Sequence, residues 1–367
     1  MKLAIFDGDG IGFEIVHAAR AVLDLITERL HLDLQCETAP VGLAAHASCG
    51  TTFPDATRAL AMQSDGILLG PLSTSDYLTL PEGGVNASAT LRKELDLYAN
   101  IRPVEALPDL AAQGRAFRIV LFRENTEGFY AVRTMFEGSG EFAPDPDTAF
   151  SLRKVTAAAS RRIADAAFTH AAQISGEVCA VHKVNVLKVS DGLFLRECRA
   201  ASERHPDVPY REEIVDATAA NLVTDPTRYD VIVTTNLFGD ILSNQIAALG
   251  GGLGLAGSLN LGALHAMAQA AHGSAPDIAG RDLANPTSIL LSLSMLLEHF
   301  GTSTRDAGFL NAAEILRSSI NETLAEGISG RTRDLGGSLG TKGFTQNVLT
   351  KVDARCRAGT TARTVPV

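Results

Sequence analysis

The chain has 367 residues, of which 46% are hydrophobic, enough to bury a large core and to favour two lobes over one. Its 42 acidic and 32 basic residues give a formal net charge of -10, which repels phosphate backbones and anionic lipid and disfavours nucleic acid and membranes as partners. The five cysteines are widely spaced and form no CxxC pair, so we expect reduced thiols rather than a disulfide framework or a zinc site.

The two ends and the apolar content of the chain predict a protein of the cytoplasm. The N-terminus becomes charged at Asp7, which is too early for a signal peptide. The most apolar stretch, 289–297, is too short to span a bilayer. The tail 355–367 is small and polar, and we expect part of it to be disordered.

Short apolar segments alternate with helical patterns along the chain, which is typical of an α/β fold. An apolar stripe at helical spacing predicts a helix over 14–30, and Asn285-Pro286 predicts the capped start of another that runs through Leu297. The predicted strands, all expected to be buried and parallel, are Leu3–Phe6, Gly66–Leu69, Arg118–Phe122, Val178–Val181 and Val231–Thr234.

A polar or glycine-rich segment follows each predicted strand. Open α/β sheets bind ligands beyond the carboxyl ends of their strands, so these segments are the candidate site. They cover 7–14, 70–74, 123–130, 182–185 and 236–244.

The first of these segments, Gly8–Glu14, resembles a dinucleotide-binding turn. A GxGxxG pattern that starts at Gly8 would place Phe13 where the third glycine belongs. The residues therefore leave open whether this segment binds a dinucleotide or is only a tight strand-to-helix turn.

Arginines recur near the predicted strand ends, at Arg92, Arg102 and Arg123. Guanidinium groups bind carboxylates through two hydrogen bonds, so three convergent arginines would suit a polycarboxylate. Spacing alone does not show convergence, and three solvated surface arginines are the simpler interpretation.

Four further side chains have both a chemical and an ordinary interpretation. Tyr130 could donate a proton or simply pack, and Lys183, at a strand end, could be a desolvated base or could extend to solvent. Asp240 and Asn244 share one face of a predicted helix, and their oxygens would suit Mg²⁺ or Mn²⁺. Asp240 as a helix N-cap is the alternative.

Together these segments resemble the β-decarboxylating dehydrogenase family of isocitrate, homoisocitrate and 3-isopropylmalate dehydrogenases, from Met1 to about Leu349. The resemblance implies two α/β lobes around one continuous sheet, unlike a standard Rossmann domain. Residues 1–98 and 253–367 would form the cofactor-binding lobe, and 99–252 the lobe for substrate, metal and dimerisation. It also implies a homodimer whose active clefts lie between the lobes and are shared between subunits.

The resemblance assigns substrate and catalytic roles residue by residue. Arg92, Arg102 and Arg123 would grip the malate carboxylates. Lys183 would be the catalytic base, supplied with Asn185 by the partner subunit. Tyr130 would protonate the enol carbon after decarboxylation.

Metal and cofactor roles are implied in the same way. Asp216 and Asp240 would bind Mg²⁺ or Mn²⁺, while Asn244 replaces the third acidic ligand of the family. Asp277 would accept from the ribose hydroxyls of NAD and repel the 2′-phosphate of NADP. The other residues expected at the cofactor are Ile11, Thr74, His272, Gly273, Ile278 and Asn285.

The implied reaction is the NAD-dependent, metal-assisted oxidative decarboxylation of a 3-substituted malate. Asn86 and Ser88 lie where isopropylmalate enzymes carry a leucine-rich patch, which favours isocitrate or homoisocitrate as the substrate. 3-Isopropylmalate, tartrate or another 3-substituted malate are alternatives, and the segment 76–82 matches neither branch. A non-catalytic regulatory subunit is the alternative of another class; Asn244 favours it, whereas Tyr130 and Lys183 oppose it.

Overall fold

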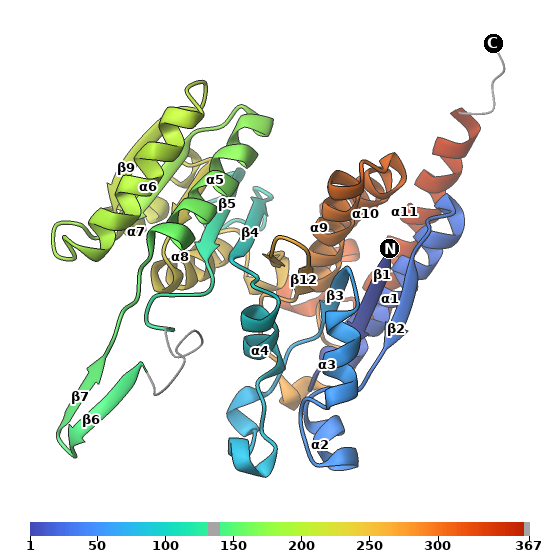
Figure 1. Cartoon of the computed structure of the whole chain (residues 1–367). Coiled ribbons are helices and arrows are strands. Elements are labelled where there is room, and N and C mark those ends of the chain that lie inside the picture. Colours follow the sequence, from blue (N-terminus) through green and yellow to red (C-terminus); the bar gives the residue numbers. More distant parts are fainter. Residues whose placement is uncertain (131–139, 363–367) are drawn as a thin grey trace. The chain divides into compact units, whose positions relative to one another are not determined.

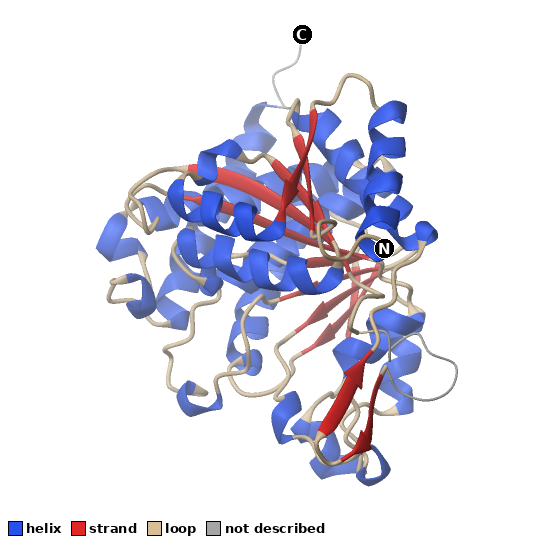
Figure 2. Ribbon diagram, turned by 90° about the vertical axis from the view of Figure 1, so that its left-hand side faces the viewer, coloured by secondary structure: helices blue, strands red, loops and turns tan. Residues whose placement is uncertain are grey.

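The computed structural model describes residues 1–130 and 140–362, which fold into two compact units of helices and strands (Figures 1 and 2). Unit 1 comprises Met1–Ser88, Leu253–Leu259 and Leu264–Val367. Unit 2 comprises Ala89–Gly252 and Asn260–Ala263. The chain therefore passes from the first unit to the second at residues 88–89, ten positions before the expected lobe boundary.

Unit 1 is built on parallel strands in the order β2-β1-β3-β12. Their bounds are β1 (Lys2–Phe6), β2 (Gln35–Thr38), β3 (Gly66–Leu69) and β12 (Ala266–Gln269). The helices of this unit are α1 (Gly12–Leu30), α2 (Leu43–Cys49), α3 (Asp55–Met62), α9 (Thr287–Thr304), α10 (Ala307–Ala325) and α11 (Thr341–Ala362). Strands β1 and β3 begin and end within one residue of their predicted positions.

The apolar stripe of the first helix is buried as predicted. Ile15, Val22 and Ile26 of α1 are fully enclosed, and α1 packs against α11. Helix α11 continues to Ala362, with Val352 and Cys356 buried, so residues 355–362 of the tail are helical, and the rest of the tail lies outside the described residues. Helix α11 is stabilised by packing against α1 and α10.

Unit 2 has strands in the order β4-β5-β10-β8-β9. They are β4 (Ala99–Ala106), β5 (Phe117–Glu124), β8 (Val178–His182), β9 (Tyr210–Ile214) and β10 (Val231–Thr234). The helices are α5 (Ala157–Ile174), α6 (Ser190–Arg204), α7 (Val215–Thr224) and α8 (Asn236–Leu249); α4 (Ala87–Glu94) and β11 (Leu259–Leu261) cross the boundary between the units. Helices α5 and α6 bury Phe168 and Phe194 against the sheet.

Strand β5 differs from its expected parallel pairing. It is parallel to β10 but antiparallel to β4, where Pro103 lies opposite Val120. No strand was predicted over Ala99–Ala106, because its polar residues and proline hide the apolar alternation that marks a strand.

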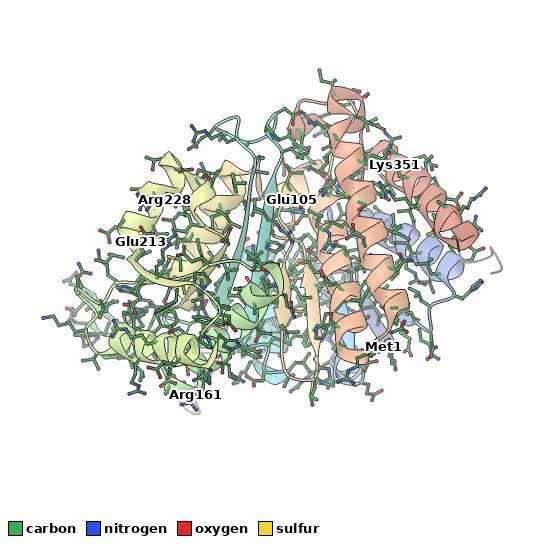
Figure 3. All side chains as sticks on the ribbon, turned by 90° about the horizontal axis from the view of Figure 1, so that it is seen from above. Met1, Glu105, Arg161, Glu213, Arg228 and Lys351 are labelled. Atoms are coloured by element: carbon green, nitrogen blue, oxygen red, sulfur yellow. The ribbon has the colours of Figure 1, made fainter. Side chains whose placement is uncertain are left out.

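The outer strand β9 is covered by charged side chains. Arg211 pairs with Glu177 and Glu213 and donates to the carbonyl oxygen of Arg228 at 2.9 Å. Glu213 and Arg228, the residues that Arg211 contacts here, are labelled in Figure 3. Charges on an edge strand discourage unwanted pairing with another chain.

A separate antiparallel hairpin, β6 (Glu141–Asp145) and β7 (Thr148–Ser151), projects from the helices of unit 2 (Figure 1). No helix within residues 1–130 and 140–362 is long and apolar enough to cross a membrane. All five cysteines are free thiols.

Candidate functional site

The expected site residues fall into two groups, one in each unit. The substrate, catalytic and metal candidates of unit 2 are Arg92, Arg102, Arg123, Tyr130, Lys183, Asn185, Asp216, Asp240 and Asn244. The candidates of unit 1 are Ile11, Thr74, Asn86, Ser88, His272, Gly273, Asp277, Ile278 and Asn285.

Arg123, at the end of β5, is the centre of the first group. It is buried, and its Nε and Nη2 donate to Asn236 Oδ1 at 2.9 and 2.8 Å. Its Nη1 donates to Asp240 Oδ1. The Tyr130 hydroxyl lies 3.4 Å from the other oxygen of Asp240, and its ring centroid lies 5.7 Å from the guanidinium of Arg123. Arg123, Tyr130 and Asp240 therefore form one cluster, although the spacing of the arginines alone favoured solvated surface positions.

A glycine in α8 makes room for this cluster. A Cβ atom at Gly239 would lie 2.6 Å from Cγ of Arg123. Asn236 and Gly239 lie in the candidate segment 236–244, but neither was assigned a role in the site. The only signal in the sequence was their place beside Asp240, at the start of a predicted helix.

Arg102, on β4, adds a second guanidinium group. Its Nε donates to Asn100 Oδ1 at 2.8 Å, and Asn100 in turn donates to Asn260 Oδ1 at 3.0 Å. Burial, and next the positive charge of Arg123, lower the pKa of Arg102 to about 10, against an opposing effect of Asp240. Two cations that face one carboxylate leave an excess of positive charge, which suits an anionic ligand. The third arginine, Arg92, is half-buried in the last turn of α4.

Lys183 follows β8 and is held at its backbone and its side chain. Its N–H donates to Asp191 Oδ2 at 2.6 Å, and its ammonium forms an ion pair with Asp216 in the first turn of α7. Hydrogen bonding from Lys183 lowers the pKa of Asp216. Lys183 is therefore neither an isolated desolvated amine nor a side chain free in solvent. Asn185, two residues on, is exposed.

The metal candidates are only partly brought together. Asp240 is the fifth residue of α8, whose N-cap is Thr235, so the alternative role of Asp240 as an N-cap is wrong. Asn244 follows one turn later and is exposed. Within the described part of the chain, no group of three His, Cys, Asp or Glu side chains could hold a metal ion. The oxygen donors of Asp240, Asn244 and Asp216 nevertheless suit a hard divalent cation.

In unit 1 the glycine turn after β1 packs closely on two other loops. Gly8 has a φ of +78°, and a Cβ atom there would lie 2.3 Å from the Pro71 carbonyl oxygen. Gly10 has a φ of +56°, and a Cβ atom there would lie 2.0 Å from the Ser274 carbonyl oxygen. The Ile11 N–H donates to the same Ser274 oxygen at 2.8 Å. The glycines thus serve backbone contacts between loops, which supports the tight-turn interpretation.

Between these glycines, the buried carboxylate of Asp9 accepts three hydrogen bonds. Its donors are the N–H of Leu43 at 2.7 Å, the N–H of Ser73 at 2.9 Å and the hydroxyl of Tyr77 at 2.6 Å. Ser73 also donates its hydroxyl to that of Ser274 at 2.7 Å. Asp9 lies in the candidate segment 7–14 but was assigned no role, because no local pattern shows that its partners lie 34 to 68 positions away.

Gly273 and Asp277 are exposed in the loop 272–278, which is expected to bind the cofactor. His272 Nδ1 lies 3.0 Å from the Gly273 carbonyl oxygen. Burial lowers the pKa of His272, and its Nε2 is buried without a hydrogen-bond partner in the described residues. A neutral imidazole with an unused nitrogen fits a role in holding a nucleotide. Ile278 ends the short turn Pro276–Ile278 of this loop.

Asn285 is engaged within unit 1. Its Oδ1 accepts from the N–H of Thr287 at 3.0 Å, and its Nδ2 donates to Asp334 at 3.0 Å. The N-cap of α9 is Pro286, so the predicted cap at Asn285 is one residue too early. If Asn285 contacts the cofactor, its amide must do so while it keeps these two hydrogen bonds or by exchanging one of them.

The segment before α4 contains the remaining candidates. Thr74 is exposed at the start of the turn Thr74–Asp76, and Asn86 is exposed just before α4. Ser88, in the first turn of α4, donates to Gln269 Oε1 at 3.0 Å. The side chains at 86 and 88 thus present polar groups, as the sequence indicated.

Comparisons with known proteins agree over nearly the whole chain. The family model described as isocitrate/isopropylmalate dehydrogenase matches residues 2–351. The chain is 40% identical to the 3-isopropylmalate dehydrogenase of Methanothermobacter thermautotrophicus, over 93% of this chain and 95% of that protein. It is 38% identical to the mitochondrial NAD isocitrate dehydrogenase catalytic subunit 5 of Arabidopsis thaliana, over 94% of this chain and 86% of that protein. The crystal structure of isocitrate dehydrogenase from Methylococcus capsulatus superposes with a TM-score of 0.83 at 36% identity, covering 96% of this chain and 99% of that one.

Proposed function

Because this chain belongs to the isocitrate/isopropylmalate dehydrogenase family, and is thus an NAD-dependent decarboxylating oxidoreductase, we propose that it acts on a 3-substituted malate, with 3-isopropylmalate as the first candidate. The observation that carries this proposal is the cluster of Arg102, Arg123, Tyr130 and Asp240. It offers cations for a dicarboxylate, a phenol that can give a proton and a carboxylate for a divalent cation.

Isocitrate or homoisocitrate is the second candidate. The substrates differ at C3, where isopropylmalate carries an apolar group and isocitrate a carboxymethyl group. Three relatives named 3-isopropylmalate dehydrogenase, 36 to 40% identical to this chain, support the first candidate. The 38% identical NAD isocitrate dehydrogenase subunit, Asn86 and the Ser88–Gln269 hydrogen bond support a polar substituent.

In this mechanism Arg102 and Arg123 bind and orient the malate carboxylates through charge-assisted hydrogen bonds. Lys183, once its ammonium has given up a proton, would accept the proton of the substrate hydroxyl as a neutral amine. NAD, when held by the loops around Asp277, would supply the hydride acceptor. After CO₂ is lost, Tyr130 donates its phenolic proton to the enol carbon. Asp9 and Ser274 belong to loops that would hold the cofactor.

A divalent cation would be held by Asp240 and Asp216, with Asn244 as a neutral third donor, and NAD by the loops around Asp277. When bound, the metal stabilises negative charge on the substrate oxygens as it develops. Asp216 is exposed and paired with Lys183, so it is accessible to a cation, while Asp240 already lies beside the substrate-binding arginines.

We further infer a homodimer with shared active sites. Asp216 and Asp240 do not form a complete metal cluster within the described residues of one chain. The hairpin β6–β7 exposes Phe142 and Phe150, whose stacked rings lie 5.1 Å apart, and an isolated two-stranded hairpin is marginally stable in water. A second subunit that covers this hairpin would stabilise it. The cytoplasmic location stays a prediction.

The test is NAD reduction by the purified homo-oligomer with 3-isopropylmalate, isocitrate, homoisocitrate, tartrate and malate, each with Mg²⁺ or Mn²⁺. We expect the highest kcat/KM with 3-isopropylmalate. A preference for isocitrate or homoisocitrate would establish the second candidate. No activity with any of them would favour the regulatory-subunit alternative, against which the intact Tyr130 and Lys183 argue.

A matched variant sharpens the substrate assignment. Ser88→Leu replaces a polar side chain with an apolar one at the expected C3-facing position. It should raise the ratio of kcat/KM for 3-isopropylmalate over isocitrate about tenfold, the effect of one apolar contact in a binding pocket. An unchanged ratio would mean that position 88 does not face the substituent.

A further inference from the structure

The segment 76–82, which matches neither branch of the family, is held at both ends in unit 1. Tyr77 donates to Asp9 at one end. At the other end, the Glu82 carbonyl oxygen lies 3.0 Å from Nε2 of His46, and a capping box joins Thr79 to Glu82. The segment is therefore a fixed part of the unit rather than a loose loop.

Its attachment point, Asp9, is a buried carboxylate with a relative exposure of 6%. Buried charges need hydrogen-bond donors, and here the donors come from Leu43, Ser73 and Tyr77. Burial and the hydrogen bond to Asp9 raise the pKa of Tyr77, so its hydroxyl is a donor at neutral pH. Removing that hydroxyl would leave a buried carboxylate with one donor fewer.

From Asp9 the contacts continue to the loops expected to bind the cofactor. The Asp9 N–H donates to the Pro71 carbonyl oxygen at 2.7 Å. Ser73 joins Ser274 through a 2.7 Å hydrogen bond between hydroxyls, and the Ile11 N–H donates to the Ser274 carbonyl oxygen at 2.8 Å. A continuous set of hydrogen bonds thus links Tyr77 to the turn 8–12 and to the loop 272–278.

We propose that Tyr77 is a positioning residue for NAD: through Asp9 it fixes the relative placement of the turn 8–12, the loop 70–74 and the loop 272–278. This inference rests on the proposed function. Tyr77 itself contacts no cofactor in this scheme. By holding the three loops in place, Tyr77 lowers the free energy needed to order them when NAD binds. The segment 76–82 therefore sets the affinity for the cofactor.

The experiment is calorimetric titration of the whole protein with NAD, followed by steady-state kinetics. Tyr77→Phe should raise the Kd of NAD about three- to tenfold, which is part of the effect of losing one hydrogen bond to a charged group. The kcat at saturating NAD should stay within about twofold of the wild-type value. Tyr210→Phe is the matched control: the Tyr210 hydroxyl also donates to a carboxylate, Glu212, at 2.9 Å, but in unit 2. It should leave the Kd unchanged.

A second variant interrupts the same set of hydrogen bonds at another residue, so the test does not depend on Tyr77→Phe alone. Ser73→Ala keeps the backbone donor to Asp9 but removes the hydroxyl link to Ser274, and it should also weaken NAD binding. If wild type binds NAD and both variants bind it with the wild-type Kd, the positioning role is overturned while the proposed function stands. If wild type binds no NAD, the proposed function falls and this inference falls with it.

Discussion

Arg102 and Arg123 concentrate positive charge beside a single carboxylate, Asp240, in a chain whose net charge is -10. An acidic protein repels a dicarboxylate at long range, so binding depends on local cations. Burial strengthens their attraction for an anion because water screens it less. We therefore expect single side chains to decide which ligand the site accepts.

Cofactor choice belongs to this scale. Asp277 is exposed in its loop, and a carboxylate there opposes the 2′-phosphate of NADP. We expect kcat/KM for NAD to exceed that for NADP by about an order of magnitude or more, and Asp277→Asn to narrow the ratio mainly by improving NADP use. Initial rates with both cofactors measure this. Equal use of both by wild type would contradict the assignment.

The catalytic pair is tested by separating the two halves of the reaction. Lys183→Met removes the amine that accepts the hydroxyl proton, so NAD reduction should be lost almost completely, by at least about a hundredfold. Tyr130→Phe should impair mainly protonation after decarboxylation. Rapid-mixing measurements of NADH formation and CO₂ release distinguish these steps. Near-normal turnover in Lys183→Met would show that another group is the base.

Helix α8 shows how one element gathers several functions. Within its first three turns it supplies Asn236 and Asp240 to Arg123, leaves space at Gly239 and presents Asn244 one turn later. Residues three or four positions apart share a helix face, so this spacing keeps the groups together. A small change in the helix surface should therefore affect substrate binding.

Gly239→Ala tests that dependence. The added methyl group would lie 2.6 Å from Cγ of Arg123, so the arginine must move away from Asn236 and Asp240. We expect KM for the malate substrate to rise about tenfold or more, because a displaced guanidinium loses its charge-assisted contacts. Gly192→Ala, in α6 with open space at its Cβ position, is the control and should leave KM unchanged. A wild-type KM in Gly239→Ala would mean that Arg123 does not grip the substrate.

The same helix carries the departure at the metal site. An amide at Asn244 keeps an oxygen donor but removes one unit of attraction for a hard cation, so wild type should need more free Mg²⁺ or Mn²⁺ for half-maximal rate than Asn244→Asp. Mn²⁺ should be favoured because it binds a given site more tightly. Metal titrations of both proteins measure the difference. Identical half-saturation values would exclude Asn244 from the metal site, and full activity in EDTA would exclude the metal altogether.

At the scale of the whole molecule, the site is divided. Lys183 and Asp216 form one pair, whereas Arg123, Tyr130 and Asp240 form another cluster of the same unit. A homodimer could join the pair of one subunit to the cluster of the other. The exposed aromatic hairpin β6–β7 would supply an apolar surface for such an assembly.

Complementation between inactive variants tests this sharing. Lys183→Met and Asp240→Asn should each be inactive alone. When the two are unfolded together and refolded, the mixture should regain up to about a quarter of wild-type activity, because about half of the dimers are then mixed and one of the two shared sites in each mixed dimer is fully wild type. Mixing without subunit exchange is the control. Mixed dimers that stay inactive would show that each chain forms its own complete site.

Sequence by itself determined the local features of this protein. The apolar runs that became β1, β3, β8 and β10 were visible because short buried strands are bounded by turn residues. The buried face of α1 followed from its helical period. The order of several motifs identified the family, and with it the residue types that the chemistry needs.

Only the tertiary structure decided which of those residues meet. Arg123 and Asp240 are 117 positions apart, and Tyr77 lies 68 positions from Asp9. The antiparallel pairing of β4 was likewise absent from the local pattern. Hydrophobic periodicity reports which face of an element is buried, whereas a hydrogen bond or an ion pair depends on two side chains that the fold brings together from distant elements. For that reason the chemical groups could be predicted from the chain, but the cluster around Asp240 and the anchoring of the segment 76–82 could not.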